Sequence, residues 1–386
     1  MSFSNYAQQL NLLFVGDAMQ HETQLKSAQT GEDSYSYDSC YMYISPIFKQ
    51  ADFTMLNLEV PLGSKPYAGY PTFCAPAAYA TALQDAGVNV MITANNHSCD
   101  KGAGGIKGTI EKLDSLGIIH TGMFSGSAQR TSRYPLIIEK NGIRLAVLNY
   151  TYGTNGIKVP QPYIVNLINE EQIVADVDLA KNLQPDIIVA CMHWGDEYVS
   201  YPNRRQKRLA SLLDSLGVRL IIGSHPHVVQ PMIFQPADSV KESRLTVYSL
   251  GNFISNQRKL NTDGGAMVRV MLSKHNDSIS IDSVSFLLTW VHTPTVNRKK
   301  KFYVLPISHF EQDSSLWKND TAAFNAMQTF ASNARSLLNK ENKGVSEEFV
   351  YWLSDSIRLK EQGLMADTPG IPQDRKTDST SSKQAE

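Results

Sequence analysis

Five short apolar runs in this chain each lead into side chains of the kind that bind metal ions. The runs cover residues 12–15, 55–58, 90–93, 187–191 and 220–223. Short apolar runs bounded by glycine and polar residues are typical of buried strands. Because ligands bind at the carboxyl ends of strands in open α/β sheets, the pattern predicts one polar site at that edge.

The side chains that follow these runs are Asp17, Glu59, Asn96, His97, His193, His225 and His227. Each also has a structural interpretation. The Gly-Asp pair at Asp17 is common in turns, Glu59 can cap the loop before Pro61, and Asn96 tolerates a left-handed turn. Together, however, they favour a two-metal hydrolytic centre, in which ions about 3.5–4 Å apart clamp an anion and activate a water. Two divalent cations against Asp17 and Glu59 leave such a site positive, so it would attract phosphate or carboxylate anions.

Amphipathic segments alternate with the apolar runs. Residues 105–116, 170–183 and 203–216 have the helical spacing of apolar side chains, and each precedes a new predicted strand. This alternation predicts an α/β fold with a layered, largely parallel or mixed sheet. Beyond residue 250, the segments 266–272, 279–290 and 302–306 indicate longer strands without intervening helices, so we expect a more antiparallel region there.

Composition excludes several classes of protein. The net charge of −1 argues against a nucleic-acid binder that relies on overall basicity. No apolar run reaches the roughly 18 residues of a membrane helix, and no signal peptide is visible. The four cysteines have no CxxC spacing, so no zinc finger or disulfide framework is predicted, and Cys191 is expected to be a small buried apolar residue.

At this point the chain resembles a known family. The segments GDAMQH, LNLEVPLG, ITANNHSCDKGAGGIKGTIEKL, HWGDEY, IIGSHPHVVQ and VYSLGNFI stand in the order seen in the CapA family of bacterial capsule (poly-γ-glutamate) synthesis proteins. The resemblance covers roughly residues 10–270. It implies a four-layer metallophosphoesterase-like β-sandwich flanked by helices over residues 1–310. We also expect a helical C-terminal extension over 311–366 and a disordered tail over 367–386.

The resemblance also implies roles for individual residues. Asp17 and His227 would bind the first of two metal ions, Glu59 would bridge the pair, and Asn96, His193 and His225 would bind the second. His97 would protonate the leaving group. Two departures weaken the first metal site: Met19 stands where the superfamily has a histidine, and Glu59 replaces the usual aspartate. His21, two residues beyond Met19, is a possible substitute ligand.

Further residues have open alternatives. Asp100 either orients His97 or caps the helix that follows it. Thr151, Tyr152 and Asn155 belong either to a substrate-contacting loop or to a plain turn. Arg204 opens a basic helix that is either a solvated face or an anion-guiding rim, and Asn252 either contacts substrate or forms a tight turn.

Two functions follow as hypotheses. The first is metal-dependent hydrolysis of a phosphate ester or related bond, with one or two Mn, Fe or Zn ions and His97 as general acid. The second is a non-hydrolytic part in assembling, anchoring or exporting an anionic polymer such as poly-γ-glutamate, within a capsule-synthesis membrane complex. The family resemblance implies the cell envelope or periplasm, while the absence of a visible anchor leaves the compartment open.

Overall fold

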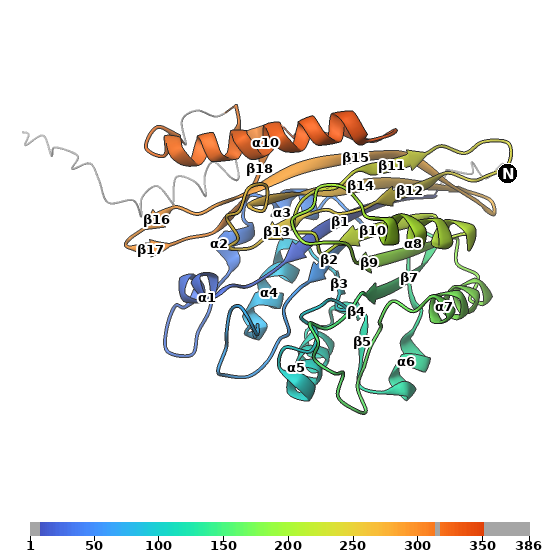
Figure 1. Cartoon of the computed structure of the whole chain (residues 1–386), viewed down its shortest axis with the longest axis horizontal. Coiled ribbons are helices and arrows are strands. Elements are labelled where there is room, and N and C mark those ends of the chain that lie inside the picture. Colours follow the sequence, from blue (N-terminus) through green and yellow to red (C-terminus); the bar gives the residue numbers. More distant parts are fainter. Residues whose placement is uncertain (1–7, 313–316, 351–386) are drawn as a thin grey trace, which may run out of the picture.

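Two β-sheets pack face to face in the computed structural model, which describes residues 8–312 and 317–350 (Figure 1). The first sheet has nine strands and the second has six. The spatial order in the first is β18 (Tyr303–Pro306), β15 (Ser278–His292), β14 (Gly264–His275), β1 (Gln8–Ala18), β2 (Phe53–Leu58), β3 (Val90–Ile92) and β4 (Ile119–Thr121), with β13 (Asn252–Ile254) beside β1 and β19 (Ser346–Glu347) beside β15. The order in the second is β11 (Met232–Gln235), β12 (Arg244–Val247), β10 (Leu220–Ser224), β9 (Ile187–His193), β7 (Ile143–Thr151) and β6 (Leu136–Lys140).

Strand direction divides the first sheet into two parts. β1, β2, β3 and β4 are parallel neighbours, whereas the pairs β1–β14, β14–β15 and β15–β18 are antiparallel. This confirms the change of pattern predicted near residue 250. In the second sheet β7, β9, β10 and β12 are parallel, and β6 and β11 close its edges as antiparallel strands.

The helices of the described residues lie mainly on the outer faces of the two sheets, whereas the last two in chain order pack with the core between the sheets. They are α1 (Glu22–Ala28), α2 (Asp38–Tyr41), α3 (Ser45–Phe48), α4 (Ala77–Ala86), α5 (Gly102–Ser115), α6 (Ser127–Arg133), α7 (Glu170–Asn182), α8 (Arg204–Ser215), α9 (Ile307–Phe310) and α10 (Thr321–Glu341). The helices predicted from spacing are confirmed as α5, α7 and α8. Two short pairs, β5 (Met123–Phe124) with β8 (Ile164–Val165) and β16 (Thr295–Val296) with β17 (Lys299–Lys300), stand apart from the two sheets.

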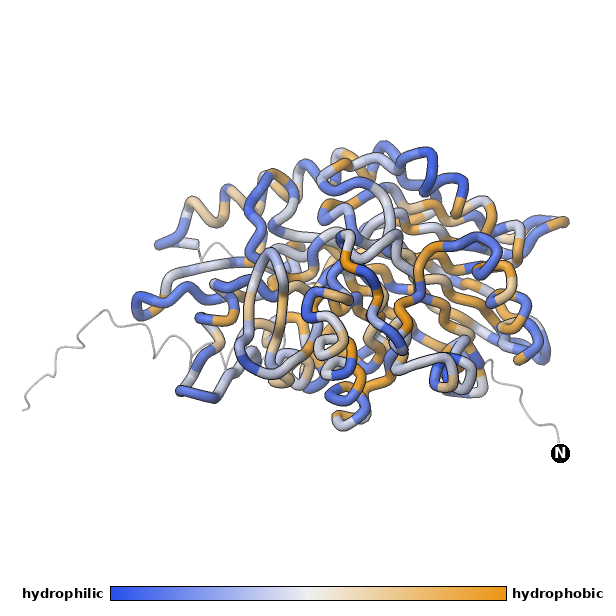
Figure 2. The backbone as a smooth tube through the Cα atoms, turned by 60° about the horizontal axis from the view of Figure 1, so that its bottom comes forward, coloured by the Kyte–Doolittle hydropathy of each residue, from blue (hydrophilic) through white to orange (hydrophobic). Residues whose placement is uncertain are grey.

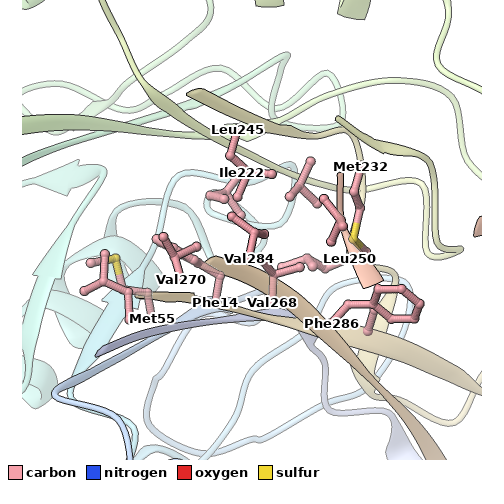
Figure 3. Close-up of a cluster of buried hydrophobic side chains, with 14 of the residues drawn as sticks. Phe14, Met55, Ile222, Met232, Leu245, Leu250, Val268, Val270, Val284 and Phe286 are labelled. Atoms are coloured by element: carbon pink, nitrogen blue, oxygen red, sulfur yellow. The ribbon is translucent and has the colours of Figure 1, made fainter. Parts of the chain in front are cut away.

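The main core lies between the sheets. In β1, Leu12 and Phe14 face inward toward the second sheet, while Leu13 and Val15 face the outer helices. Figure 3 shows Phe14 in this core among residues of both sheets, including Ile222 of β10. Because both faces of such a strand are covered, it reads as a continuous apolar run. The tube in Figure 2 shows the apolar strands inside a polar periphery, and the predicted four-layer α/β fold is confirmed.

Helix α10 extends the same core. Asp320 caps it by accepting a hydrogen bond from the Ala323 amide, and its apolar face packs with the inter-sheet cluster that contains Phe286 and Trp290 of β15. The predicted helix therefore exists but ends at Glu341, after which the chain returns to the first sheet as β19. The expected remainder of the extension and the tail (351–386) lie outside the described residues, and the domain boundary at 310 stays a prediction. Within the described residues no helix has the length and apolar composition that crossing a membrane requires.

Candidate metal centre

The six residues predicted to bind metal all lie at one edge of the sandwich. Asp17 ends β1 and Glu59 follows β2, whereas His193 ends β9 in the opposite sheet. Asn96 comes from the loop after β3, and His225 and His227 from the loop after β10. None of the six is more than 3 % exposed. Two sheets therefore contribute side chains to one buried cluster, as the strand-end pattern predicts.

Their ligand atoms form two overlapping groups. Asp17, Glu59 and His193 make one group and Glu59, His225 and His227 make the other, with ligand atoms within 4.8 Å of one another in each. Glu59 is common to both, in keeping with a bridging role, but the groups place Asp17 with His193, whereas the resemblance implies Asp17 with His227. The Asn96 Oδ1 atom lies 2.8 Å from His193 Nε2, and His227 Nδ1 lies 3.3 Å from Asp17 Oδ2.

The donor set fits a divalent cation. Ligands about 2.1 Å from one ion at tetrahedral or octahedral angles lie about 3 to 3.5 Å apart, close to the separations found here. Two buried atoms of the cluster, Glu59 Oε1 and His225 Nδ1, have no hydrogen-bond partner in the described structure. Buried polar atoms normally have one, so these atoms point to a missing ligand. Carboxylate, amide oxygen and imidazole are donors that divalent metal ions accept in proteins.

Asn57 is a member of the cluster that the sequence analysis missed. Its Nδ2 atom donates to Asp17 Oδ1 over 2.7 Å and lies 3.3 Å from both Glu59 Oε2 and His193 Nδ1. The amide thus positions three of the proposed ligands. The available signal was a polar residue inside the apolar run of β2, two positions before Glu59 and therefore on the same face of the strand. Ser224 was also missed, and its Oγ atom lies 2.8 Å from His193 Nδ1.

A hydrogen bond and a ring contact fix the orientation of the His97 imidazole, as its proposed role in proton transfer requires. Its Nδ1 atom lies 2.8 Å from Asp100 Oδ2, and the same carboxylate oxygen accepts the Phe73 amide. The Phe73 ring meets the imidazole edge to face at 4.6 Å. The N-cap of α5 is Lys101, so of the two alternatives for Asp100 the structure favours the one that orients His97. A hydrogen bond between Nδ1 and Asp100 fixes the orientation of the ring and leaves Nε2 as the ring nitrogen available for proton transfer.

The predicted substrate residues occupy different places. Tyr152 is 37 % exposed, with its ring 4.5 Å from that of His225, so it borders the cluster. Asn155 accepts a hydrogen bond from the Asn96 amide. Thr151 is buried, and its hydroxyl donates to the Gly153 carbonyl within the turn. Arg204 is exposed at the first residue of α8.

Asn252 differs from the expectation. It is fully buried, its Nδ2 donates to Gln257 and to the Thr262 carbonyl, and its Oδ1 lies 3.0 Å from His227 Nδ1. With its amide engaged in this way, it orients His227 rather than presenting a free group to substrate. The prediction missed this because the spacing of a Gly-Asn pair does not reveal which side chain the amide meets.

The structure also shows where Met19, which departs from the superfamily pattern, and its possible substitute His21 lie. Met19 is buried in the apolar cluster between the first sheet and its outer helices. His21 begins α1, where its ring contacts Gln24 and accepts the Asn256 amide. Neither residue belongs to the ligand groups found in the described part of the chain.

Burial sets the protonation of the cluster. It raises the pKa of Glu59 well above its ordinary value of 4.5, and the neighbouring charge of Asp17 adds to the effect. Burial, followed by repulsion from His227, lowers the pKa of His225 to about 3. Burial and then the charge of His225 place the pKa of His193 well below 6.5. The imidazoles of His193 and His225 are therefore neutral and ready to bind metal, whereas Glu59 retains a proton that a cation must displace.

We expect metal affinity to rise with pH. A raised pKa means that metal-free Glu59 holds its proton as pH increases beyond 4.5, and binding must release it until the raised pKa is passed. Calorimetric titration with Mn or Zn in buffers of different ionisation enthalpy would show protons released on binding, in a number that falls as pH passes the raised pKa of Glu59. Titrations showing no proton release and a flat affinity from pH 5 to 7 would contradict this protonation state.

Two layered sheets, with carboxylate, amide and imidazole side chains gathered at their strand ends, define the class of α/β sandwich proteins with a polar site at one edge. Within it, the chain belongs to the family described as bacterial capsule synthesis protein PGA_cap, whose model matches residues 11–257. This confirms the resemblance seen in the six segments. Every residue predicted for the site lies inside the matched range.

Two relatives and one solved structure are similar to the chain. The PGA biosynthesis protein CapA of Bacillus subtilis (strain 168) is 29 % identical over 285 residues, covering 69 % of this chain and 68 % of the relative. The capsule biosynthesis protein CapA of Bacillus anthracis is 27 % identical over 283 residues, covering 70 % and 66 %. The chain thus matches about two thirds of each relative's length. The calcineurin-like phosphoesterase YfkN from Bacillus subtilis superposes with a TM-score of 0.43 and 13 % identity, over 86 % of this chain and 99 % of that one.

Proposed function

We propose that the chain is a metal-dependent hydrolase that cleaves a phosphate ester or a related polar bond in an anionic substrate. The observation that carries the proposal is the buried cluster around Glu59, whose Oε1 atom has no hydrogen-bond partner in the described structure. Asp17, Glu59, Asn96, His193, His225 and His227 would hold the cations. Mn, Fe or Zn bound there would supply Lewis-acid polarisation and an activated water at neutral pH.

The remaining residues have distinct tasks in this proposal. Asp100 fixes the His97 ring through Nδ1, so that the doubly protonated imidazolium form would donate the proton on Nε2 to the leaving oxygen as the bond breaks and return to neutral imidazole. Asn57 and Asn252 orient Asp17 and His227 through hydrogen bonds. Tyr152 and Asn155 border the cluster, and Arg204 would guide anions toward it.

Chelator-sensitive turnover would test the proposal. We expect the purified chain, loaded with Mn or Zn, to hydrolyse bis-p-nitrophenyl phosphate or p-nitrophenyl phosphate. Removal of the metal with EDTA should abolish the activity and added metal should restore it. Activity that persists in EDTA, or metal-loaded protein inactive on a broad panel of phosphate esters, would overturn the hydrolase proposal.

A non-hydrolytic role is the second candidate, favoured by the names of the two capsule-biosynthesis relatives. Here the same cluster, made positive by bound cations, would retain an anionic polymer such as poly-γ-glutamate during its assembly or export, within a membrane complex. Polymer that is bound but unchanged in length after long incubation with metal-loaded protein would support this role. Shortening of the polymer would exclude it.

A further inference from the structure

Six cations gather on one side of the molecule, outside the matched family range. Two belong to the loop after β13 and four to the β16–β17 hairpin, which projects beyond β18 in Figure 1. We call this set the basic ridge: Arg258, Lys259, Arg298, Lys299, Lys300 and Lys301. In a chain of net charge −1 this is a local concentration of positive charge, and overall composition does not account for it.

Contacts join the two segments of the ridge. The Lys300 ammonium donates to Asn256 Oδ1 over 3.3 Å, and the Asn256 amide donates to His21 at the start of α1. Lys299 reaches the Gln29 carbonyl beyond the other end of α1 over 3.5 Å. Burial and then the charge of Arg258 lower the pKa of Lys300, so the two segments lie close enough for their charges to repel. The ridge is thus one surface rather than two separate loops.

One end of the ridge meets the candidate metal centre. The Lys259 ammonium lies 3.8 Å from the centroid of the Tyr198 ring, and that ring lies 6.0 Å from the ring of His227. Tyr198 has a φ of 66°, an uncommon value for a bulky residue, and its amide donates to the Pro226 carbonyl over 2.8 Å. This backbone bond holds Tyr198, and with it Lys259, beside the loop that carries His225 and His227.

The ridge has few carboxylate partners. Within residues 8–312 and 317–350, none of its six cations forms an ion pair, whereas exposed lysines elsewhere do, such as Lys107 with Glu111 and Lys181 with Asp178. Glu22 of α1 pairs with Lys26. Asp263 accepts the Trp290 indole, and its charge also acts on Arg258, which leaves five ridge cations without a carboxylate shown beside them. Clustered like charges that are left unpaired destabilise a fold, so a complementary anion would relieve their repulsion.

We infer that the basic ridge binds an extended polyanionic chain, with closely spaced carboxylates or phosphates, and directs it to the candidate metal centre. We commit to a flexible chain rather than a membrane surface because Lys259, at one end of the ridge, is packed on Tyr198 beside the cluster, so that the ridge leads from the hairpin to the proposed metal ligands. The inference extends the proposed function but concerns binding alone, so each can fail without the other.

The test compares binding of two polymers, poly-γ-glutamate and inorganic polyphosphate, to the full chain. The ridge variant is Arg298→Gln/Lys299→Gln/Lys301→Gln. The matched control, Lys107→Gln/Lys181→Gln/Lys340→Gln, removes the same charge from exposed lysines that have carboxylate neighbours. We expect the wild type and the control to bind equally, and the ridge variant to bind about tenfold more weakly, with salt weakening all three. The preferred polymer identifies the anionic group.

Several outcomes separate this inference from the proposed function. His193→Ala, which removes a proposed metal ligand, should still bind polymer through the ridge. Equal binding by the ridge variant and the wild type would overturn the inference and leave the hydrolase proposal standing. Equal losses in the ridge variant and the control would show that total charge, not the ridge, is responsible. Binding to vesicles of anionic phospholipid but to neither polymer would overturn the inference and identify a membrane surface as the partner of the ridge.

Discussion

Replacing His97 with alanine is expected to slow hydrolysis by about 10²–10⁴-fold while leaving the bound metal in place. The reason is geometric. His97 follows the proposed ligand Asn96, and Asp100 holds its Nδ1 atom at 2.8 Å, so its other ring nitrogen can serve the leaving group. It belongs to neither group of ligand atoms that could surround an ion. Its removal should therefore affect proton transfer and spare metal binding.

The measurement is turnover of a phosphodiester together with metal content in the same preparation. The loss should be smallest for substrates whose leaving group needs no proton, such as p-nitrophenolate, and largest for alkoxide leaving groups. His275→Ala, at the exposed end of β14, is the matched control and should behave as wild type. An unchanged rate in His97→Ala with a poor leaving group would remove the role assigned to this residue.

The Glu59→Gln substitution is expected to leave the stability of the fold unchanged or higher without metal, and to lower it when metal is bound. Without metal, Glu59 is a fully buried carboxylate beside Asp17, and its charged form is costly. Its raised pKa gives stability that is complete below pH 4.5 and is lost as pH rises through the raised value. At neutral pH the metal-free glutamine variant should therefore be at least as stable as the wild type.

With metal bound, the wild type should be more stable than the Glu59→Gln variant. A ligand present at a hundred to a thousand times its Kd stabilises the folded state by about 3–4 kcal/mol, and the variant lacks the carboxylate oxygen common to both ligand groups. Denaturant unfolding of the wild type and of the variant, each with EDTA and with Mn or Zn, gives the four free energies of unfolding that this comparison needs. Glu111→Gln, on the exposed face of α5, should track the wild type in both conditions. An equal metal-dependent gain in the Glu59→Gln and wild-type proteins would exclude Glu59 as a ligand.

The strand-end pattern predicted much of this site because the position of a residue along a parallel strand determines at which edge of the sheet it lies. Parallel strands place their carboxyl ends at one edge, so polar residues that follow apolar runs must gather there. Asp17, Glu59 and the histidines follow this rule. The same rule, combined with the helical spacing of α5, α7 and α8, was enough to predict the layers.

Other features depend on contacts that spacing does not encode. Asn57 lies inside an apolar run, and only the facing sheet reveals that its amide meets both Asp17 and His193. Asn252 reads as a turn residue until its partner His227 is seen. Similarly, the return of the chain from α10 to the first sheet as β19 leaves no periodicity in a two-residue strand.

The most direct test of the metal centre is the metal content of the purified chain by elemental analysis, after reconstitution with Mn, Fe or Zn. The arrangement around Glu59 predicts close to two ions per chain, with a reduced content in both Asp17→Ala and His193→Ala. One ion, lost in His193→Ala but kept in Asp17→Ala, would mean a single-metal site and a narrower chemistry. Absence of metal after reconstitution would contradict the metal centre and leave the polymer-binding role as the remaining candidate.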